Sequence, residues 1–175
     1  MFLSLRELEL RKIPFELQIP PGKLEFADEL KQVTPIVVKG EAELVSDVLG
    51  EIRVSGKLRV TMEAPCDRCV EPATLPIESD FDLTYRPDES GAPAGEVHVS
   101  EGESEIGFYS GDGLQLDDIL LEQIVLALPM RKVCSPGCKG ICPSCGQNRN
   151  LTPCACDNKP PLESQWTAAL HSLKK

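Results

Sequence analysis

The strongest constraint on the fold of this chain is a run of six cysteines within residues 134–156, CSPGCKGICPSCGQNRNLTPCAC. Cys142 and Cys145 stand three positions apart and Gly146 follows them, which is the CPxCG pattern of a zinc knuckle. Two thiolates at this spacing can hold one ion, and a closed tetrahedron of soft thiolates suits Zn²⁺. The segment therefore predicts a structural zinc site, worth on the order of 10 kcal/mol of folding free energy in a small module.

One zinc ion takes four of the six cysteines, and several combinations are open. The knuckle pair supplies two ligands, and the other two can come from before it, from after it, or one from each side. We favour Cys154 and Cys156, because they close a loop of eight residues onto the knuckle. A closed four-thiolate site leaves no open position for catalysis. The candidate ligands are Cys142, Cys145, Cys154, Cys156, Cys138 and Cys134.

Cys66 and Cys69 form a separate CxxC pair between two predicted strands. The pair can be half of a metal site completed by the C-terminal cysteines, a redox dithiol, or two reduced cysteines at a turn. Redox motifs of the thioredoxin type open a helix, whose N-terminus lowers the thiol pKa, whereas this pair lies in a predicted hairpin. A thiol–disulfide redox protein or sensor that uses this pair is therefore the alternative function.

The chain is acidic, with a formal net charge of −10 and a pI of about 4.7. This charge argues against a broad surface that follows nucleic-acid phosphates, but it allows a local basic patch or a basic protein partner. Five cations near the cysteines could contact RNA or a partner, or could be ordinary solvated charges. They are Arg68, Arg131, Lys132, Lys139 and Arg149.

The first residues do not form a signal peptide, and no segment has the length and apolarity of a membrane-spanning helix. A cytoplasmic protein with no membrane partner is therefore expected, and in that reducing compartment eight cysteines indicate metal or redox chemistry rather than structural disulfides. No glycine-rich phosphate loop, HExxH or GxSxG motif occurs. We therefore expect no enzyme activity and no small-molecule substrate.

Period-two alternation between residues 36 and 86 predicts three long strands joined near 47–50 and 64–72. They read as an antiparallel meander, or a partly closed sheet, with one apolar face that the apolar helix over 116–128 would cover. Residues 1–35 are read as extended or edge-strand segments, and 87–105 as a mobile acidic loop.

The predicted class is α+β, in two parts. Residues 1–130 form the core domain. Residues 131–175 form a zinc-binding segment followed by a short amphipathic helix, which begins near Leu162 and includes Trp166.

The order of these features resembles a known bacterial family. CDRC at a hairpin, an acidic loop, DDILLEQIVLALPM and then CSPGCKGICPSCGQNRN…CAC is similar to the large ribosomal RNA subunit accumulation protein family, YceD. The family's C-x-R-C is matched by Cys66, Arg68 and Cys69, and its CKGLCPxCGxNxN…CxC by residues 138–156. The resemblance extends from about residue 35 to the C-terminus.

The resemblance implies a cytosolic factor needed for normal accumulation of large-subunit ribosomal RNA. Its partner would be a ribosomal protein or a pre-ribosomal particle with its rRNA. Other members lack the C-terminal cysteines, which implies that the metal site is accessory to the fold. Members commonly continue into an acidic-Pro-Arg stretch, whereas this chain has Glu163, Ser164 and Gln165 before Trp166.

Overall fold

The protein is described by a computed structural model, which covers residues 1–26, 29–46, 49–88 and 106–158. Strands dominate these residues and helices are few, so the predicted α+β class is confirmed. The elements are β1 (Phe2–Ser4), α1 (Leu5–Leu10), β2 (Ile13–Ile19), β3 (Lys31–Gln32), β4 (Ile36–Ser46), β5 (Glu51–Pro65), β6 (Pro72–Pro87), β7 (Ile106–Tyr109), β8 (Gly113–Gln115), α2 (Leu116–Leu126) and the 3-10 helix η2 (Ala155–Asn158).

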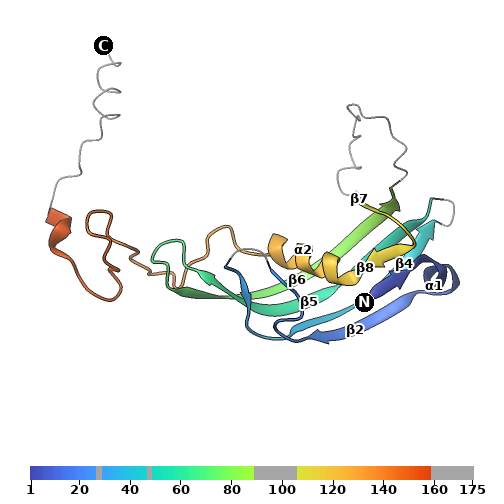
Figure 1. The fold of residues 1–175 in the computed structure, drawn as a ribbon, viewed down its shortest axis with the longest axis horizontal. Helices are drawn as coiled ribbons and strands as arrows, with labels where there is room; N and C mark the ends of the chain where they lie inside the picture. Colours follow the sequence, from blue (N-terminus) through green and yellow to red (C-terminus); the bar gives the residue numbers. More distant parts are fainter. Residues whose placement is uncertain (27–28, 47–48, 89–105, 159–175) are drawn as a thin grey trace, which may run out of the picture.

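The main sheet is a long, curved ribbon (Figure 1). Its strand order is β2-β4-β5-β6-β7, and β3 pairs with β5 beside this path. Neighbours from β2 to β6 are antiparallel, whereas β7 runs parallel to β6. The β5–β6 pair keeps one register from Ile52 opposite Tyr85 to Pro65 opposite Pro72, so this hairpin extends along the sheet to its tip. A separate two-stranded sheet pairs β1 with β8.

The alternation of β5 follows from its half-buried position in the sheet. Ile52, Val54 and Leu58 are at most 1% exposed, while Arg53 and Arg59, each next to one of them in sequence, point to solvent. On the solvent face, cations of β5 pair with carboxylates of β6 across the strands. These pairs are Arg53–Asp82, Lys57–Asp80 and Arg59–Glu78.

A row of two glycines and two phenylalanines crosses the middle of the sheet. Phe15 of β2 lies opposite Gly40 of β4, which lies opposite Gly56 of β5, which lies opposite Phe81 of β6. A Cβ on Gly40 would come within 2.7 Å of the Phe15 ring, and one on Gly56 within 2.9 Å of the Phe81 ring. Each aromatic ring therefore fills the space that the neighbouring glycine leaves, and both rings are buried.

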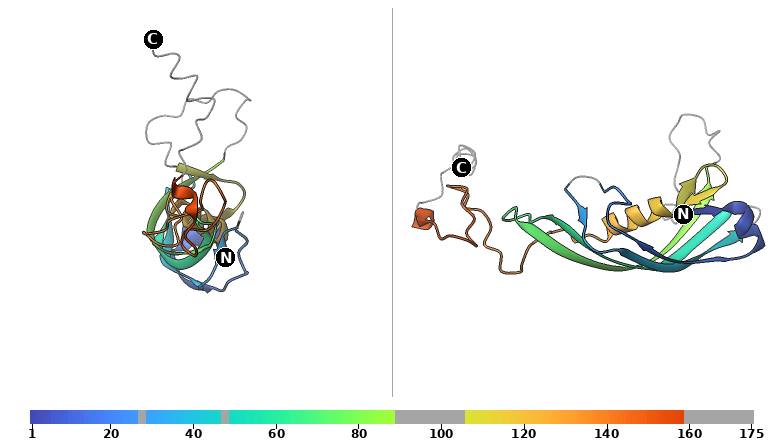
Figure 2. Two further views of the ribbon diagram at one scale, coloured as in Figure 1. Left: turned by 90° about the vertical axis from the view of Figure 1, so that its left-hand side faces the viewer. Right: turned by 60° about the horizontal axis from the view of Figure 1, so that its bottom comes forward.

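Helix α2 lies along the concave side of the sheet (Figures 1 and 2). Leu116, Ile119, Leu120 and Ile124 are at most 4% exposed and belong to the same core cluster as the inward residues of β4, β5 and β6. Burial of each such side chain contributes about 2 kcal/mol. After Leu126 the chain leaves the helix and continues to the tip of the β5–β6 hairpin, which brings the C-terminal cysteines to that end of the sheet.

Residues 1–35 are not all extended, because Leu5–Leu10 form α1; the sequence LRELEL consists of strong helix formers, and Leu8 is buried against the core. The acidic segment 89–105 and the predicted C-terminal helix lie outside the described residues. Within the described residues, no helix is long and apolar enough to cross a lipid bilayer.

Candidate metal centres

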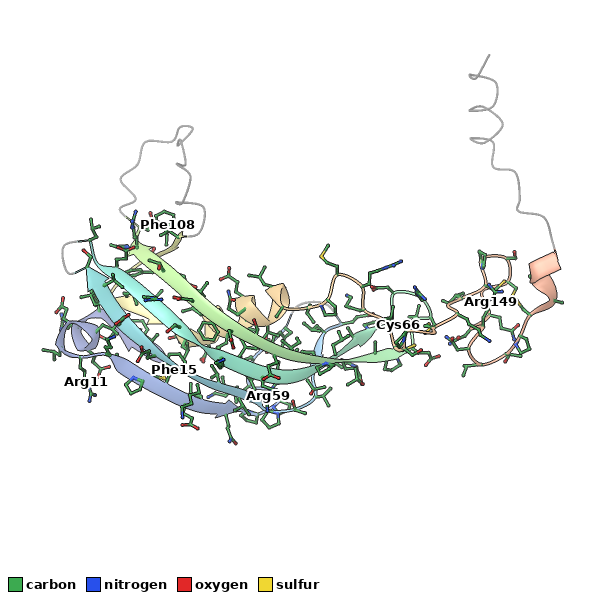
Figure 3. All side chains as sticks on the ribbon, turned by 180° about the vertical axis from the view of Figure 1, so that it is seen from behind. Arg11, Phe15, Arg59, Cys66, Phe108 and Arg149 are labelled. Carbon is green, nitrogen blue, oxygen red and sulfur yellow. The ribbon has the colours of Figure 1, made fainter. Side chains whose placement is uncertain are left out.

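The eight cysteines gather into two groups of four. In each group the four sulfur atoms lie within 4.8 Å of one another. We call Cys66, Cys69, Cys134 and Cys138 cluster A, and Cys142, Cys145, Cys154 and Cys156 cluster B. Cluster A lies at the tip of the β5–β6 hairpin and cluster B lies beyond it, as the positions of Cys66 and Arg149 in Figure 3 indicate.

The two CxxC turns have the same backbone geometry. In cluster A the Cys66 N–H donates to the Glu71 carbonyl at 2.8 Å, and the Val70 N–H donates to the Cys66 carbonyl at 2.9 Å. In cluster B the Cys142 N–H donates to the Gln147 carbonyl at 2.8 Å, and the Gly146 N–H donates to the Cys142 carbonyl at 2.9 Å.

The residue after the second cysteine has a left-handed backbone in both turns, with φ of 65° at Val70 and 73° at Gly146. CDRC is therefore a knuckle like CPSC. This similarity is not evident from the sequence, because Val70 occupies the position where the C-terminal knuckle has Gly146.

Cluster A joins parts of the chain that are far apart in sequence. The Cys66 and Cys138 sulfurs lie 3.9 Å apart, and the Cys69 and Cys134 sulfurs lie 3.6 Å apart. A tetrahedral ion with Zn–S bonds near 2.3 Å requires sulfurs about 3.8 Å apart, whereas a disulfide requires about 2 Å. All four cysteines are free, so the spacing fits four ligands of one ion.

Two reciprocal hydrogen bonds fix the segment after α2 onto the hairpin tip. The Asp67 N–H donates to the Lys132 carbonyl at 2.7 Å, and the Lys132 N–H donates back to the Asp67 carboxylate at 2.6 Å. The Cys134 N–H then donates to the Cys66 sulfur at 3.3 Å. Sequence analysis did not identify this role of Asp67; its position between the two cysteines of the knuckle was the available signal.

Side chains around cluster A complete its hydrogen bonds. Asn150 donates its side-chain amide to the Cys138 sulfur at 3.3 Å. Arg68 donates its guanidinium to the Cys138 carbonyl at 2.9 Å, and its backbone N–H donates to the Cys66 sulfur at 3.5 Å. Such contacts hold a thiolate in place and spread its negative charge.

The thiol pKa values in cluster A differ widely. Burial raises the pKa of Cys66, but the backbone N–H groups of Arg68, Cys134 and Cys69 outweigh it and lower that pKa to about 6. Burial raises the pKa of Cys69 to about 12. Four thiolates this close together repel one another, so full ionisation becomes favourable only when a cation lies between them.

The thiol pKa values in cluster B also differ widely. The backbone N–H groups of Cys145 and Ser144 lower the pKa of Cys142 to about 6, while the Cys145 thiol raises the pKa of Cys156 to about 12. Cys142 is 2% exposed, but Cys145 is exposed and the other two are intermediate. Cluster B is thus the more accessible of the two groups.

All sequence-predicted ligands lie in one group or the other. The structure brings together the favoured set in cluster B. Cys134 and Cys138 lie with Cys66 and Cys69 instead, which corresponds to the reading of CDRC as half of a metal site. A soft, closed set of four thiols in each cluster fits Zn²⁺ by its donor chemistry.

The five predicted contact cations surround these clusters. Within the described residues, Arg68, Arg131, Lys132 and Lys139 form no ion pair with a carboxylate. Arg68 is nevertheless engaged with the Cys138 carbonyl, and the Arg149 backbone N–H donates to the Gly140 carbonyl at 2.9 Å. Part of this basic group therefore has a structural role beside the cysteines.

Comparison with known proteins places this architecture in a family. The family model described as "Large ribosomal RNA subunit accumulation protein YceD" matches residues 54–174. The chain is 27% identical over 146 residues to the maize (Zea mays) "Large ribosomal RNA subunit accumulation protein YCED homolog 1, chloroplastic", covering 70% of this chain and 49% of that protein.

It is also 27% identical over 103 residues to an uncharacterised protein of Mycobacterium tuberculosis, covering 58% of this chain and 47% of that protein. The chain thus spans about half the length of the curated relatives it matches. No solved structure gives a significant match. The family model nevertheless covers well over half of the chain and agrees with the resemblance found in the sequence, so the chain belongs to the YceD family of large ribosomal RNA subunit accumulation proteins.

Proposed function

We propose that this chain is a non-enzymatic factor that supports accumulation of large-subunit ribosomal RNA, with structural zinc in clusters A and B. The observation that carries the proposal is the family match over residues 54–174, and the maize relative has the same role in its name. The cysteine clusters support the structural part, because each group of four thiols has the spacing of a closed metal site rather than of a catalytic centre.

Zinc in cluster A would tie residues 132–138 to the hairpin tip, and zinc in cluster B would close the loop that follows. The residues that would hold the ions are the eight cysteines, with Asn150 and Arg68 supporting Cys138. When bound, the ions would supply cross-links rather than Lewis-acid chemistry, because four thiolates fill the tetrahedron.

Charge favours a basic ribosomal protein, or a particle that contains one, over naked RNA. Residues 1–130 carry eleven Lys and Arg against 26 Asp and Glu, whereas residues 131–175 carry seven against two. Each zinc with four thiolates would add a net charge of about −2, so much of the C-terminal positive charge would offset the metal centres. Cations on the solvent face of β5 are already ion-paired.

A hollow of about 510 Å³ near the opposite end of the sheet is a candidate contact for such a partner. Its lining includes the rings of Phe2 and Phe108, which are 52% and 65% exposed, and the carboxylates of Asp118 and Glu122. Within the described residues neither carboxylate has an ion pair. The two residues lie four positions apart on α2, so their negative charges repel each other. Lys or Arg side chains would be held there by the carboxylates and by cation–π contacts.

The redox alternative has weaker support. Cys66 and Cys69 are 1% and 4% exposed and share their cluster with two further cysteines, which is unfavourable for attack on a substrate disulfide.

We infer that the chain works in the compartment in which ribosomes assemble, as a cytoplasmic protein if that compartment is the bacterial cytosol.

Two experiments test the proposal. Depletion of the protein should lower the ratio of large-subunit to small-subunit rRNA, and re-expression should restore it; an unchanged ratio would contradict the role. A pull-down from lysate at low and moderate salt, with and without nuclease, should recover a large-subunit ribosomal protein or a pre-ribosomal particle. If recovery of a ribosomal protein survives nuclease, direct protein contact is supported; if nuclease and salt both abolish it, RNA is the partner.

A further inference from the structure

The two cysteine clusters are joined by a linker that is held on both sides. Cys138 belongs to cluster A and Cys142 to cluster B, with only residues 139–141 between them. The Ile141 N–H donates to the Arg68 carbonyl at 2.9 Å, which fixes the linker to the first knuckle. Gly140, with φ of 73°, passes so close that a Cβ there would lie 3.0 Å from the Arg68 carbonyl oxygen.

The loop closed by cluster B reaches back to cluster A. Asn150 lies between Cys145 and Cys154, yet its amide donates to the Cys138 sulfur at 3.3 Å. The side-chain oxygen Oδ1 of Asn150 accepts a hydrogen bond from the Lys139 N–H at 2.7 Å. A side chain whose position depends on closure of cluster B is therefore in direct contact with a ligand atom of cluster A.

A second contact supports the placement of this loop. The Asn150 backbone N–H and side-chain amide both donate to the side-chain oxygen Oδ1 of Asn148 at 3.0 Å. Asn148 in turn donates to the Glu71 carboxylate at 3.3 Å, next to the first knuckle. Asn148 thus anchors the loop to the hairpin tip, and Asn150 anchors it to Cys138 of cluster A.

We propose that clusters A and B bind metal as a coupled pair, each raising the other's affinity through Asn150 and Arg68. The inference rests on the metal-binding part of the proposed function. Metal in cluster B orders the loop and presents the Asn150 donor to the Cys138 sulfur, which holds that sulfur in position as a ligand of cluster A. Metal in cluster A fixes Cys138 and the linker, which holds Cys142 in place.

Binding linkage requires the two effects to be equal in size. Loss of an outer-shell partner typically lowers metal affinity by about 10–100-fold, and we expect the coupling factor in this range.

Titration with Co²⁺ tests the coupling directly, because thiolate-bound Co²⁺ absorbs visible light and its affinity can be measured against a chelator. The paired substitution Cys142→Ser and Cys145→Ser should weaken cluster A by about 10–100-fold, and Cys66→Ser with Cys69→Ser should weaken cluster B by the same factor. Far-UV circular dichroism of each variant checks that the sheet stays folded. If each remaining cluster keeps its wild-type affinity, the coupling is overturned.

Asn150→Asp separates the donor from the rest of the loop. The aspartate keeps an oxygen for the Lys139 N–H but loses the amide that donates to Cys138, so cluster A should bind Co²⁺ about 10-fold more weakly with all eight thiols intact. Gln147→Ala is the matched control, because Gln147 is exposed and contributes only its backbone carbonyl to the hydrogen bonds of the described residues.

Equal weakening in both of these variants, or wild-type affinity in Asn150→Asp, would contradict the role of Asn150. A wild-type chain that binds no Co²⁺ would overturn the metal sites and the coupling with them. Two ions bound with independent affinities would overturn the coupling alone.

Discussion

Val70 offers a sharp test of the knuckle geometry at cluster A. Its φ of 65° is left-handed, which is unfavourable for a β-branched side chain, and it is 64% exposed, so little packing compensates. The hydrogen bond from its N–H to the Cys66 carbonyl imposes this conformation when the knuckle forms. The substitution Val70→Gly should therefore help cluster A to assemble around a metal.

The size of the effect follows from two opposing terms. Left-handed backbone costs an L-residue about 1–2 kcal/mol, and glycine loses about 0.5–1 kcal/mol more conformational freedom on ordering. The difference of about 0.5–1 kcal/mol corresponds to about 2–5-fold tighter metal binding by cluster A. Gly146→Val places the same strain in cluster B, where φ is 73°, and should weaken that cluster by a similar factor.

The assay is Co²⁺ affinity of each cluster by chelator competition. Val33→Gly serves as a control, because Val33 is 50% exposed and is not among the left-handed residues. This control should leave Co²⁺ affinity unchanged and lower the free energy of unfolding by about 0.5–1 kcal/mol. If Val70→Gly binds Co²⁺ more weakly than the wild type while the sheet stays folded, the strain argument is refuted and the valine side chain must make a stabilising contact.

Three further predictions concern the core, the solvent face and the partner site. Gly56→Val should lower the free energy of unfolding by about 1–3 kcal/mol, because its Cβ would lie 2.9 Å from the Phe81 ring and 2.8 Å from the Lys39 carbonyl. Urea unfolding measures this change, and an unchanged midpoint would contradict the packing. Asp82→Asn should cost up to about 1 kcal/mol at pH 7. Arg53 lowers the pKa of Asp82, so the stabilisation from this ion pair is present above about pH 4 and should disappear as the pH falls below it. A difference in unfolding free energy between wild type and Asp82→Asn that persists in acid would contradict this assignment. Asp118→Asn with Glu122→Gln should weaken capture of a basic ribosomal protein and reduce the salt dependence of binding, whereas Asp80→Asn on the solvent face should not. Equal loss of binding in both variants would indicate that the overall negative charge of the chain, and not this hollow, attracts the partner.

The long strands could be located from the sequence because burial alternates along most of their length. Ile52, Val54 and Leu58 are buried and Arg53 and Arg59 are exposed, so the period of two persists along β5 apart from Gly56, which is only half-buried. Helix α2 was recognisable for the same reason, since its apolar stripe is continuous and ends before Pro129. Local periodicity carries information of this kind whenever one face of an element is buried.

Helix α1 was not recognisable from its sequence. Leu8 and Leu10 alternate with charged residues as they would in a strand, and six residues are too few for a helical period to stand out. The parallel pairing of β7 with β6 was also beyond reach, because nothing in a four-residue strand specifies which neighbour it joins.

The division of the cysteines into two groups depends on tertiary structure. Spacing identified Cys142 and Cys145 as a knuckle, but it could not assign Cys134 and Cys138, since their partners lie about 70 residues earlier in the chain. The hairpin tip and the segment after α2 meet because the sheet and the helix run side by side to the same end. The contacts of Asp67 with Lys132 then determine which cysteines meet.

The most direct test of the account is the zinc content of the purified chain, measured by elemental analysis and native mass spectrometry at saturating zinc. We predict two zinc ions in the wild type, one after Cys66→Ser with Cys69→Ser, and one after Cys142→Ser with Cys145→Ser. A wild type with a single zinc ion would contradict the two-centre account, as would the Cys66 and Cys69 variant if it retained two zinc ions and lost a disulfide-exchange activity.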